Sequence, residues 1–194
     1  MRIVGGRHRG RRIAAPPGEA IRPTSDRVRE AVFNILAHGG FGEGGASIVA
    51  GAVVLDIFCG TGAMGLEALS RGAARAVFVD NEPQSLVAVR ANIAALREQA
   101  AARVMAADAL RPPPRQKDQP PATLAFLDPP YAENIAAAAL QAFAREGWLA
   151  PGAICVVEEA ARAPALVPPP GFAALETRRY GAARVTILRA VLHA

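Results

Sequence analysis

From residue 53 onward, short apolar runs alternate with segments whose apolar residues recur at helical spacing. Five of the runs are apolar nearly throughout, which is typical of strands buried on both faces. These runs are residues 53–58, 76–80, 102–108, 122–128 and 153–159. Helical patterns lie between them, at residues 60–72 (after a turn), 83–99 and 136–147. Strands that alternate with helices predict a mostly parallel sheet covered on both faces.

The two ends of the chain have different patterns. Residues 173–180 and 183–191 are β-like and separated by a short connection at Gly181, a spacing that predicts an antiparallel hairpin at the edge of the sheet. Residues 2–16 contain short β-like runs broken by glycines and predict a small hairpin or arm. A helix is predicted within residues 22–38. The expected fold is therefore α/β and Rossmann-like, with a seven-stranded sheet and an N-terminal β-hairpin arm.

The length of 194 residues suits one α/β domain with a small appendage. We expect residues 1–21 to form a basic arm and residues 22–194 to form the main domain. Two further segments have the composition of loops. Residues 39–51 are rich in glycine and predict a mobile loop, and residues 111–121 are rich in proline and predict a surface loop.

Composition narrows the class of protein. No apolar stretch approaches the roughly 18 residues that a membrane helix needs, and no apolar segment follows the basic N-terminus as in a signal peptide. Cys59 and Cys155 lie in unlike contexts without C-x-x-C spacing, so free thiols are expected rather than a disulfide or a zinc site. These features predict a cytoplasmic protein without a bound metal, and nothing in the sequence requires more than a monomer.

The positive charge is concentrated at the N-terminus. Residues 1–30 hold eight arginines and three acidic residues, so this segment has the same net charge, +5, as the whole chain. A local arginine cluster is typical of a surface that binds nucleic acid phosphates, since the guanidinium group binds phosphate through two hydrogen bonds. The alternatives are a solvated arm and, for the last arginines, ion pairs along a helix with Asp26 and Glu30. The candidate RNA-binding residues are Arg7, Arg9, Arg11, Arg12, Arg22, Arg27 and Arg29.

A glycine motif follows the strand at residues 53–58. Gly60, Gly62 and Gly65 have G-x-G-x-x-G spacing between a strand and a helix, where the backbone can turn tightly and approach a ligand. Asp80 ends the next strand, and an acid there can accept hydrogen bonds from the ribose hydroxyls of a nucleoside cofactor. Asp108 ends the third strand in the same way.

Two cofactors fit such a site, a nicotinamide dinucleotide and S-adenosylmethionine. Asp56, four residues before the first glycine, suits the cationic methionine end of S-adenosylmethionine and has no role on a pyrophosphate. A nicotinamide enzyme also usually needs a substrate domain, for which little chain is left. The sequence therefore favours S-adenosylmethionine.

With these motifs, the chain resembles class I S-adenosylmethionine-dependent methyltransferases, which also end their sheet in an antiparallel hairpin. It is most similar to the RsmD family, bacterial enzymes that methylate guanine N2 in 16S rRNA. The resemblance runs nearly end to end and rests on the blocks RIVGGRHRGRRI, RPTSDRVREAVFNIL, DIFCGTGAMGLEALSRGA, FVDNE and LDPPY.

The resemblance implies functional residues at matching positions. Asp80 would hold the ribose and Asp108 the adenine amino group of S-adenosylmethionine. The implied cofactor site comprises Asp56, Gly60, Thr61, Gly62, Asp80, Asn81, Asp108 and Ala109. It further implies a catalytic motif of Asp128, Pro129, Pro130 and Tyr131, and as a partner the 16S rRNA, in the small ribosomal subunit or its late precursor.

The motif DPPY suits methylation of an exocyclic amine, a poor nucleophile because its lone pair is delocalised into the ring. Acceptors on the two N–H groups favour a tetrahedral nitrogen, and the Asp128 carboxylate and the Pro129 carbonyl are the candidates. Pro130 restricts Pro129 to an extended conformation, which would direct that carbonyl outward. Tyr131 can stack on an extruded base. Whether Asp128 is also the general base is a hypothesis.

Other functions share some of these motifs. DNA adenine-N6 methyltransferases also contain DPPY, although they usually carry a larger target-recognition region. A non-catalytic RNA-binding or assembly protein on the same scaffold would not need an intact glycine loop. The resemblance to the RsmD family favours guanine-N2 methylation of 16S rRNA over these alternatives.

Overall fold

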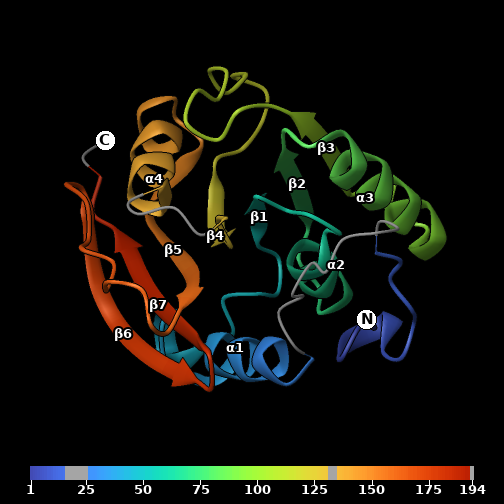
Figure 1. Ribbon diagram of the computed structural model, residues 1–194, viewed down its shortest axis with the longest axis horizontal. Coiled ribbons are helices and arrows are strands. Elements are labelled where there is room, and N and C mark those ends of the chain that lie inside the picture. Colours follow the sequence, from blue (N-terminus) through green and yellow to red (C-terminus); the bar gives the residue numbers. More distant parts are fainter. Residues whose placement is uncertain (16–25, 131–134, 193–194) are drawn as a thin grey trace.

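The seven strands form one sheet in the order β3-β2-β1-β4-β5-β7-β6, which crosses Figure 1 as an arc from β6 in red to β3 in green. The computed structural model describes residues 1–15, 26–130 and 135–192. The strands are β1 Val53–Ile57, β2 Arg75–Asp80, β3 Ala102–Ala106, β4 Ala122–Leu127, β5 Leu149–Ala160, β6 Phe172–Tyr180 and β7 Ala183–Ala190. The helices are α1 Asp26–His38, α2 Ala63–Ser70, α3 Pro83–Leu96 and α4 Ile135–Arg145, with 3-10 turns η1 Gly6–His8 and η2 Glu43–Gly45.

The direction of the strands confirms the predicted fold. β1 lies at the centre and pairs in parallel with β2 and β4, and β3 and β5 extend the parallel sheet on either side. β7 is antiparallel to both β5 and β6, so the C-terminal hairpin forms one edge as expected. β5 begins earlier than the apolar pattern indicated, because Leu149 already pairs with Ala122.

Helices cover both faces of the sheet. Side chains that alternate along the strands enter two separate apolar cores. Val54, Phe78 and Phe126 belong to the core beneath α1, α2 and α3, whereas Leu55 and Leu127 belong to the core beneath α4. Within the described part of the chain, no helix is long and apolar enough to span a bilayer.

The two predicted loops are attached to the domain by specific contacts. In the glycine-rich segment 39–51, Val49 is buried and the Phe41 carbonyl accepts a hydrogen bond from Arg189 of β7. In the proline-rich segment 111–121, the Pro113 carbonyl accepts a hydrogen bond from the Trp148 indole at 2.7 Å. Trp148 itself packs in the core beneath α4.

The N-terminal residues form the predicted hairpin, reduced to one antiparallel bridge between Arg2 and Arg12. The hairpin packs firmly on the domain, since Ile3 and Ile13 are buried in the core beneath α1, α2 and α3. The hydroxyl of Ser70, the last residue of α2, donates to the Gly5 carbonyl at 2.6 Å. The hairpin is therefore a fixed projection of the fold.

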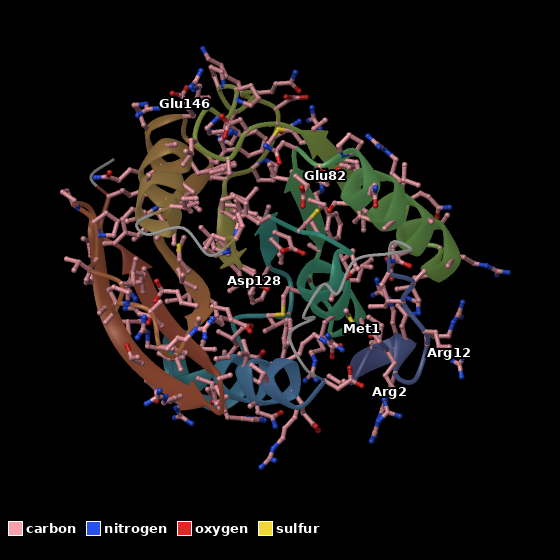
Figure 2. The ribbon with its side chains drawn as sticks, in the orientation of Figure 1. Met1, Arg2, Arg12, Glu82, Asp128 and Glu146 are labelled. Atoms are coloured by element: carbon pink, nitrogen blue, oxygen red, sulfur yellow. The ribbon has the colours of Figure 1, made fainter. Side chains whose placement is uncertain are left out.

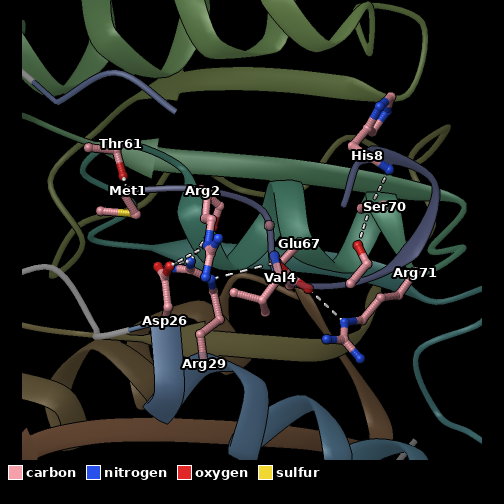
Figure 3. A network of polar contacts seen from close by, with 12 residues as sticks. Met1, Arg2, Val4, His8, Asp26, Arg29, Thr61, Glu67, Ser70 and Arg71 are labelled. Atoms are coloured by element: carbon pink, nitrogen blue, oxygen red, sulfur yellow. Dashed lines mark hydrogen bonds and ion pairs between the residues drawn. The ribbon is translucent and has the colours of Figure 1, made fainter. Parts of the chain in front are cut away.

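A buried carboxylate joins this hairpin to two helices (Figure 3). Glu67 of α2 is fully buried and accepts hydrogen bonds from the Val4 amide at 2.8 Å and the Arg71 guanidinium at 2.7 Å. Its other ionic neighbour is Arg29 of α1, whose Nε lies 3.6 Å from Glu67 Oε2. Arg29 also donates to the Arg2 carbonyl and to Asp26. One carboxylate thus ties together the hairpin, α1 and α2.

Removal of this carboxylate is expected to destabilise the protein strongly. Glu67→Ala leaves the buried Arg29 charge without its nearest buried counter-charge, a loss that costs about 3–5 kcal/mol of unfolding free energy. Urea unfolding measures this change. The matched control, Glu176→Ala, breaks an exposed ion pair with Arg178 and should cost no more than about 1 kcal/mol. Similar losses for the two variants would contradict the structural role of Glu67.

Candidate active site

Four acidic residues lie at or near the carboxyl ends of neighbouring parallel strands. Asp56 is the penultimate residue of β1 and Asp80 the last residue of β2, while Asp108 follows β3 and Asp128 follows β4. Parallel strands end at one edge of the sheet, and open α/β sheets bind ligands at this edge. The structure therefore brings together the acidic residues that the sequence analysis selected.

The glycine loop begins with a sharp change of direction after β1. Phe58 has a positive φ of 59°, which is uncommon for a bulky residue, and Gly60 has a φ of 51°. Gly62 has a φ of 78°, and a Cβ atom there would lie only 2.6 Å from Val89 Cγ2. A Cβ atom on Gly60 would face open space, so this part of the loop is accessible to a ligand.

Asp80 holds the glycine loop in place. One carboxylate oxygen accepts a hydrogen bond from the Gly60 amide at 2.9 Å, and the other accepts from the Glu82 amide at 2.9 Å. Each carboxylate oxygen can accept a second hydrogen bond, and Asp80 is half-exposed. The residue can therefore bind a pair of hydroxyl groups while it supports the loop.

Asp56 is buried directly behind the loop. Its Oδ2 accepts a hydrogen bond from the Gly65 amide at 2.9 Å, at the start of α2. Burial raises the pKa of the carboxyl group to about 8 against the opposing effect of the Gly65 hydrogen bond, and the nearby charges of Asp128 and Asp80 raise it further. Asp56 is thus mainly protonated at neutral pH in the protein alone.

The remaining cofactor-site candidates lie around this loop in different environments. Thr61 is buried, and its carbonyl accepts a hydrogen bond from Asn92. Asn81 is exposed, whereas Ala109 is buried in the core beneath α4. Asp108 is exposed and accepts a hydrogen bond from the Leu110 amide, so its side chain is accessible.

Cys59, inside the loop, is buried, and burial raises the pKa of its thiol well above the usual range. The thiol therefore stays protonated and is a small apolar side chain rather than a nucleophile. No group of three or more His, Cys, Asp or Glu side chains in the described residues is arranged to hold a metal ion.

Asp128 and Pro129 line a cavity of about 490 Å³ beyond β4. Asp128 is exposed, Pro129 is half-buried and Pro130 is exposed. Figure 2 shows Asp128 near the centre of the molecule. The lining of the same cavity also contains Glu158, near the end of β5, and Tyr180, the last residue of β6. A second hollow, of about 20 Å³, is lined by Asp56, Asp128 and Glu158. Tyr131, the predicted stacking residue, lies outside the described residues.

Comparison with known proteins identifies the family of this chain. Residues 1–189 match the family model described as Conserved hypothetical protein 95. The chain is 35% identical to ribosomal RNA small subunit methyltransferase D of Escherichia coli K12 over 158 residues, which cover 81% of this chain and 74% of that protein. The protein of the same name from Haemophilus influenzae is 33% identical over 172 residues, 87% of this chain and 83% of that one. The chain belongs to the RsmD family.

A solved structure supports the same conclusion. A putative methyltransferase from Escherichia coli superposes with a TM-score of 0.80 at 28% identity, covering 98% of this chain and 97% of that one. The fold is also shared by an S-adenosylmethionine-dependent methyltransferase from Aquifex aeolicus, with a TM-score of 0.62 and 13% identity. The Rossmann-like methyltransferase fold expected from the sequence is therefore confirmed for this RsmD-family protein.

One arginine of the predicted RNA-binding set is excluded by its position in the RsmD-family fold. Arg29 is fully buried and bound to Asp26, Glu67 and the Arg2 carbonyl, so it does not face RNA. The helical ion pair with Asp26, which the sequence left open as the alternative, is correct for this residue. Arg22 lies outside the described residues.

The other described arginines of the set lie at the surface, and some of their side chains are bound to other residues of the protein. Arg7 is bound to the buried Glu98 at 2.6 Å, and Arg11 donates to the Ala95 carbonyl at 2.6 Å. Arg9, Arg12 and Arg27 are exposed. Figure 2 shows Arg12 pointing away from the domain.

The sequence analysis missed Glu158 and Tyr180 in the cavity lining. The signal for Glu158 was present, because the fifth apolar run ends on Glu158 and Glu159 just as the second, third and fourth runs end on aspartates. Tyr180 was assigned only to the hairpin, because the sequence does not indicate that the turn between β6 and β7 lines the same cavity as the residues after β4.

The raised pKa of Asp56 predicts a specific pH dependence of stability. The folded protein holds a proton that the unfolded chain loses above pH 3.8, so the contribution of Asp56 to stability falls as the pH rises from about 4 to about 8. The slope is at most about 1.4 kcal/mol per pH unit. The neutral variant Asp56→Asn should lose this slope in urea unfolding measured at several pH values.

The matched control is Asp118→Asn, the same substitution at an exposed site in the proline-rich loop. This control should keep the wild-type slope. A wild-type slope in Asp56→Asn would show that Asp56 is already ionised in the folded protein.

Proposed function

We propose that this protein transfers a methyl group from S-adenosylmethionine to the exocyclic N2 of a guanine in bacterial 16S rRNA. The observation that carries the proposal is the position of Asp128 and Pro129, which line a cavity at the same sheet edge as the glycine loop and its strand-end acids. Membership of the RsmD family supports it, because relatives in this family are named as methyltransferases of small-subunit rRNA.

The residues around the glycine loop fit S-adenosylmethionine. Asp80 would accept hydrogen bonds from the two ribose hydroxyls, and the accessible Asp108 would accept from the adenine amino group. Asp56 would lie near the cationic methionine end, and a nearby cation favours the ionised carboxylate. We therefore expect Asp56 to release its proton when the cofactor binds. When bound, S-adenosylmethionine supplies an activated methyl group on a sulfonium.

The residues after β4 suit the substrate amine. The Asp128 carboxylate and the Pro129 carbonyl would each accept one N–H of the amine, which favours a tetrahedral nitrogen with its lone pair directed at the methyl group. Fixed acceptors of this kind act most strongly where water is excluded. Methyl transfer leaves an excess proton on the product nitrogen, and Asp128 would accept it. Tyr131 would stack on the base.

The N-terminal hairpin would contact the RNA backbone. Arg9, Arg12 and Arg27 are exposed cations on or close to an element that is packed on α2. Binding through phosphate contacts positions a substrate without selecting a sequence. We propose that the protein acts as a monomer in the cytoplasm on the small ribosomal subunit or its late precursor.

An assay with radiolabelled S-adenosylmethionine tests the function. Unmodified small subunits, naked 16S rRNA and DNA are each incubated with the protein, and the labelled nucleoside is identified. We expect label in guanine of the rRNA. Label in DNA adenine would replace the proposal with a DNA methyltransferase, and the absence of label from every substrate would favour a non-catalytic RNA-binding protein.

The same assay tests the role of Asp128. Asp128→Asn removes a charged acceptor from the amine, and kcat should fall about 10²–10³-fold while the dissociation constant of S-adenosylmethionine is unchanged. Calorimetry measures the dissociation constant. Asp118→Asn is the control with the same change of charge and should keep wild-type kcat. Near-wild-type turnover of Asp128→Asn would remove Asp128 from the catalytic step.

Neutralisation of the hairpin tests the RNA-binding surface. The double variant Arg9→Gln/Arg12→Gln should weaken binding to the small subunit and lower the slope of log K against log salt by up to about 2, because each phosphate contact contributes about 0.9. The control, Arg103→Gln/Arg145→Gln, removes two exposed charges from β3 and α4. Equal salt slopes for the two double variants would place the hairpin outside the interface.

A further inference from the structure

A second acidic residue, Glu158, lies next to Asp128 in the lining of the cavity. β4 and β5 are parallel neighbours, and Leu127 pairs with Val157, the last residues before the two acids. Paired strands lie about 4.8 Å apart, so the next residues along each strand are adjacent. Asp128 and Glu158 line both the large cavity and the small hollow.

The alternation of side chains along the two strands directs both acids to the same side of the sheet. Phe126 and Val156 enter the core beneath α1, whereas Leu127 and Val157 enter the opposite core. Asp128 and Glu158, two residues beyond the first pair, therefore face the side of α1. Val28 of α1 lines the same cavity. A base in this cavity would meet two carboxylates along one edge.

Among the RNA bases, guanine matches two adjacent carboxylates best. Its Watson–Crick edge presents the N1–H group and the N2 amine side by side, so neighbouring atoms all donate hydrogen bonds. Adenine and cytosine place a ring nitrogen with a lone pair next to their exocyclic amine. A carboxylate that faces this lone pair would be repelled and left without a donor, which is costly in a cavity.

We propose that Glu158 determines the specificity for guanine by accepting the N1–H hydrogen bond while Asp128 and Pro129 hold the N2 amine. The inference rests on the proposed function and adds the group that distinguishes guanine N2 from the exocyclic amines of other bases. Glu158 does not touch the transferred methyl group in this scheme, so it is a specificity residue and not a proton acceptor.

The rest of the cavity suits a single nucleotide. A volume of about 490 Å³ lies within the usual range of small-ligand sites, about 300–1,000 Å³. Tyr180 contributes an aromatic side chain to the lining of the same cavity, and base stacking on an aromatic ring is common in RNA recognition. Arg162 and Arg179 are exposed cations in the cavity wall, available to a phosphate.

The test replaces guanine by 2-aminopurine, which keeps the amine at C2 but presents a lone pair at N1. The methylated guanine is first mapped on unmodified small subunits with the wild-type protein. Subunits are then reconstituted from 16S rRNA carrying guanine or 2-aminopurine at that position, and kcat/KM is measured for the wild type, Glu158→Gln and Glu146→Gln. Figure 2 shows Glu146 well away from Asp128, and Glu146→Gln is the control.

The wild type should prefer guanine over 2-aminopurine by about 10- to 100-fold. The side-chain amide introduced by Glu158→Gln can donate to the N1 lone pair of 2-aminopurine. The kcat/KM of this variant should therefore fall about 10-fold on guanine and rise on 2-aminopurine. The preference should therefore shrink at least 10-fold. The wild type and Glu158→Gln both lose the same O6 contact with 2-aminopurine. A comparison of their guanine to 2-aminopurine ratios of kcat/KM therefore reports the contact at N1 alone. Glu146→Gln should keep the wild-type ratio.

If Glu158→Gln loses turnover, its preference is measured from dissociation constants instead. The fluorescence of 2-aminopurine reports binding of the 2-aminopurine RNA, and competition by the guanine RNA gives the dissociation constant of the latter. An unchanged ratio in Glu158→Gln, in kcat/KM or in affinity, would overturn the role of Glu158 while guanine labelling by the wild type leaves the proposed function standing. Failure of the wild type to label guanine in 16S rRNA would instead contradict the proposed function itself.

Discussion

The parallel pairing of β1 with β2 and β4 determines where the functional groups of this protein lie. Because these strands run in one direction, their terminal acids gather at one edge and their charges repel one another. The fold offsets this repulsion with backbone donors: the Gly60 and Glu82 amides bind Asp80, and the Gly65 amide binds Asp56. What remains is an acidic edge that favours cationic groups and N–H donors. Burial is the main cause of the raised pKa of Asp56 there, and the charges of Asp128 and Asp80 add to it.

The same edge explains how a cationic cofactor and a donor-rich base could share one site. Asp56 and Asp80 bind amides of the glycine segment, Asp128 and Glu158 line the cavity, and the small hollow is lined by Asp56 together with Asp128 and Glu158. Glu67 of α2 binds the N-terminal hairpin through the Val4 amide, and Met1 of the hairpin contacts the Thr61 hydroxyl in the glycine loop. These contacts fix the position of the hairpin relative to this edge. RNA contacts made by the hairpin would therefore position the substrate relative to the cofactor.

Periodicity in the sequence was sufficient to predict the sheet, its helices and the C-terminal hairpin, because each element buries a regular apolar pattern. The rule that the ends of parallel strands meet at one edge of the sheet was sufficient to predict that the acidic residues lie together there. These residues are Asp56, Asp80, Asp108 and Asp128. Burial of charged residues was not predictable in this way. In the sequence, Arg29 has the pattern of an arginine on the exposed face of a helix. Its burial depends on the tertiary contact with Glu67 of α2, which is distant in sequence. Tyr180 likewise joins the cavity through the turn between β6 and β7.

If this edge methylates guanine N2 in the small-subunit rRNA, one modified nucleoside in cells should depend on this protein. Mass spectrometry of 16S rRNA nucleosides and fragments, from cells that contain or lack the protein, tests this dependence. We expect one N2-methylguanosine to disappear when the protein is absent and to return with the wild-type chain but not with Asp128→Asn. An identical set of N2-methylguanosines in the two cell types would contradict this expectation.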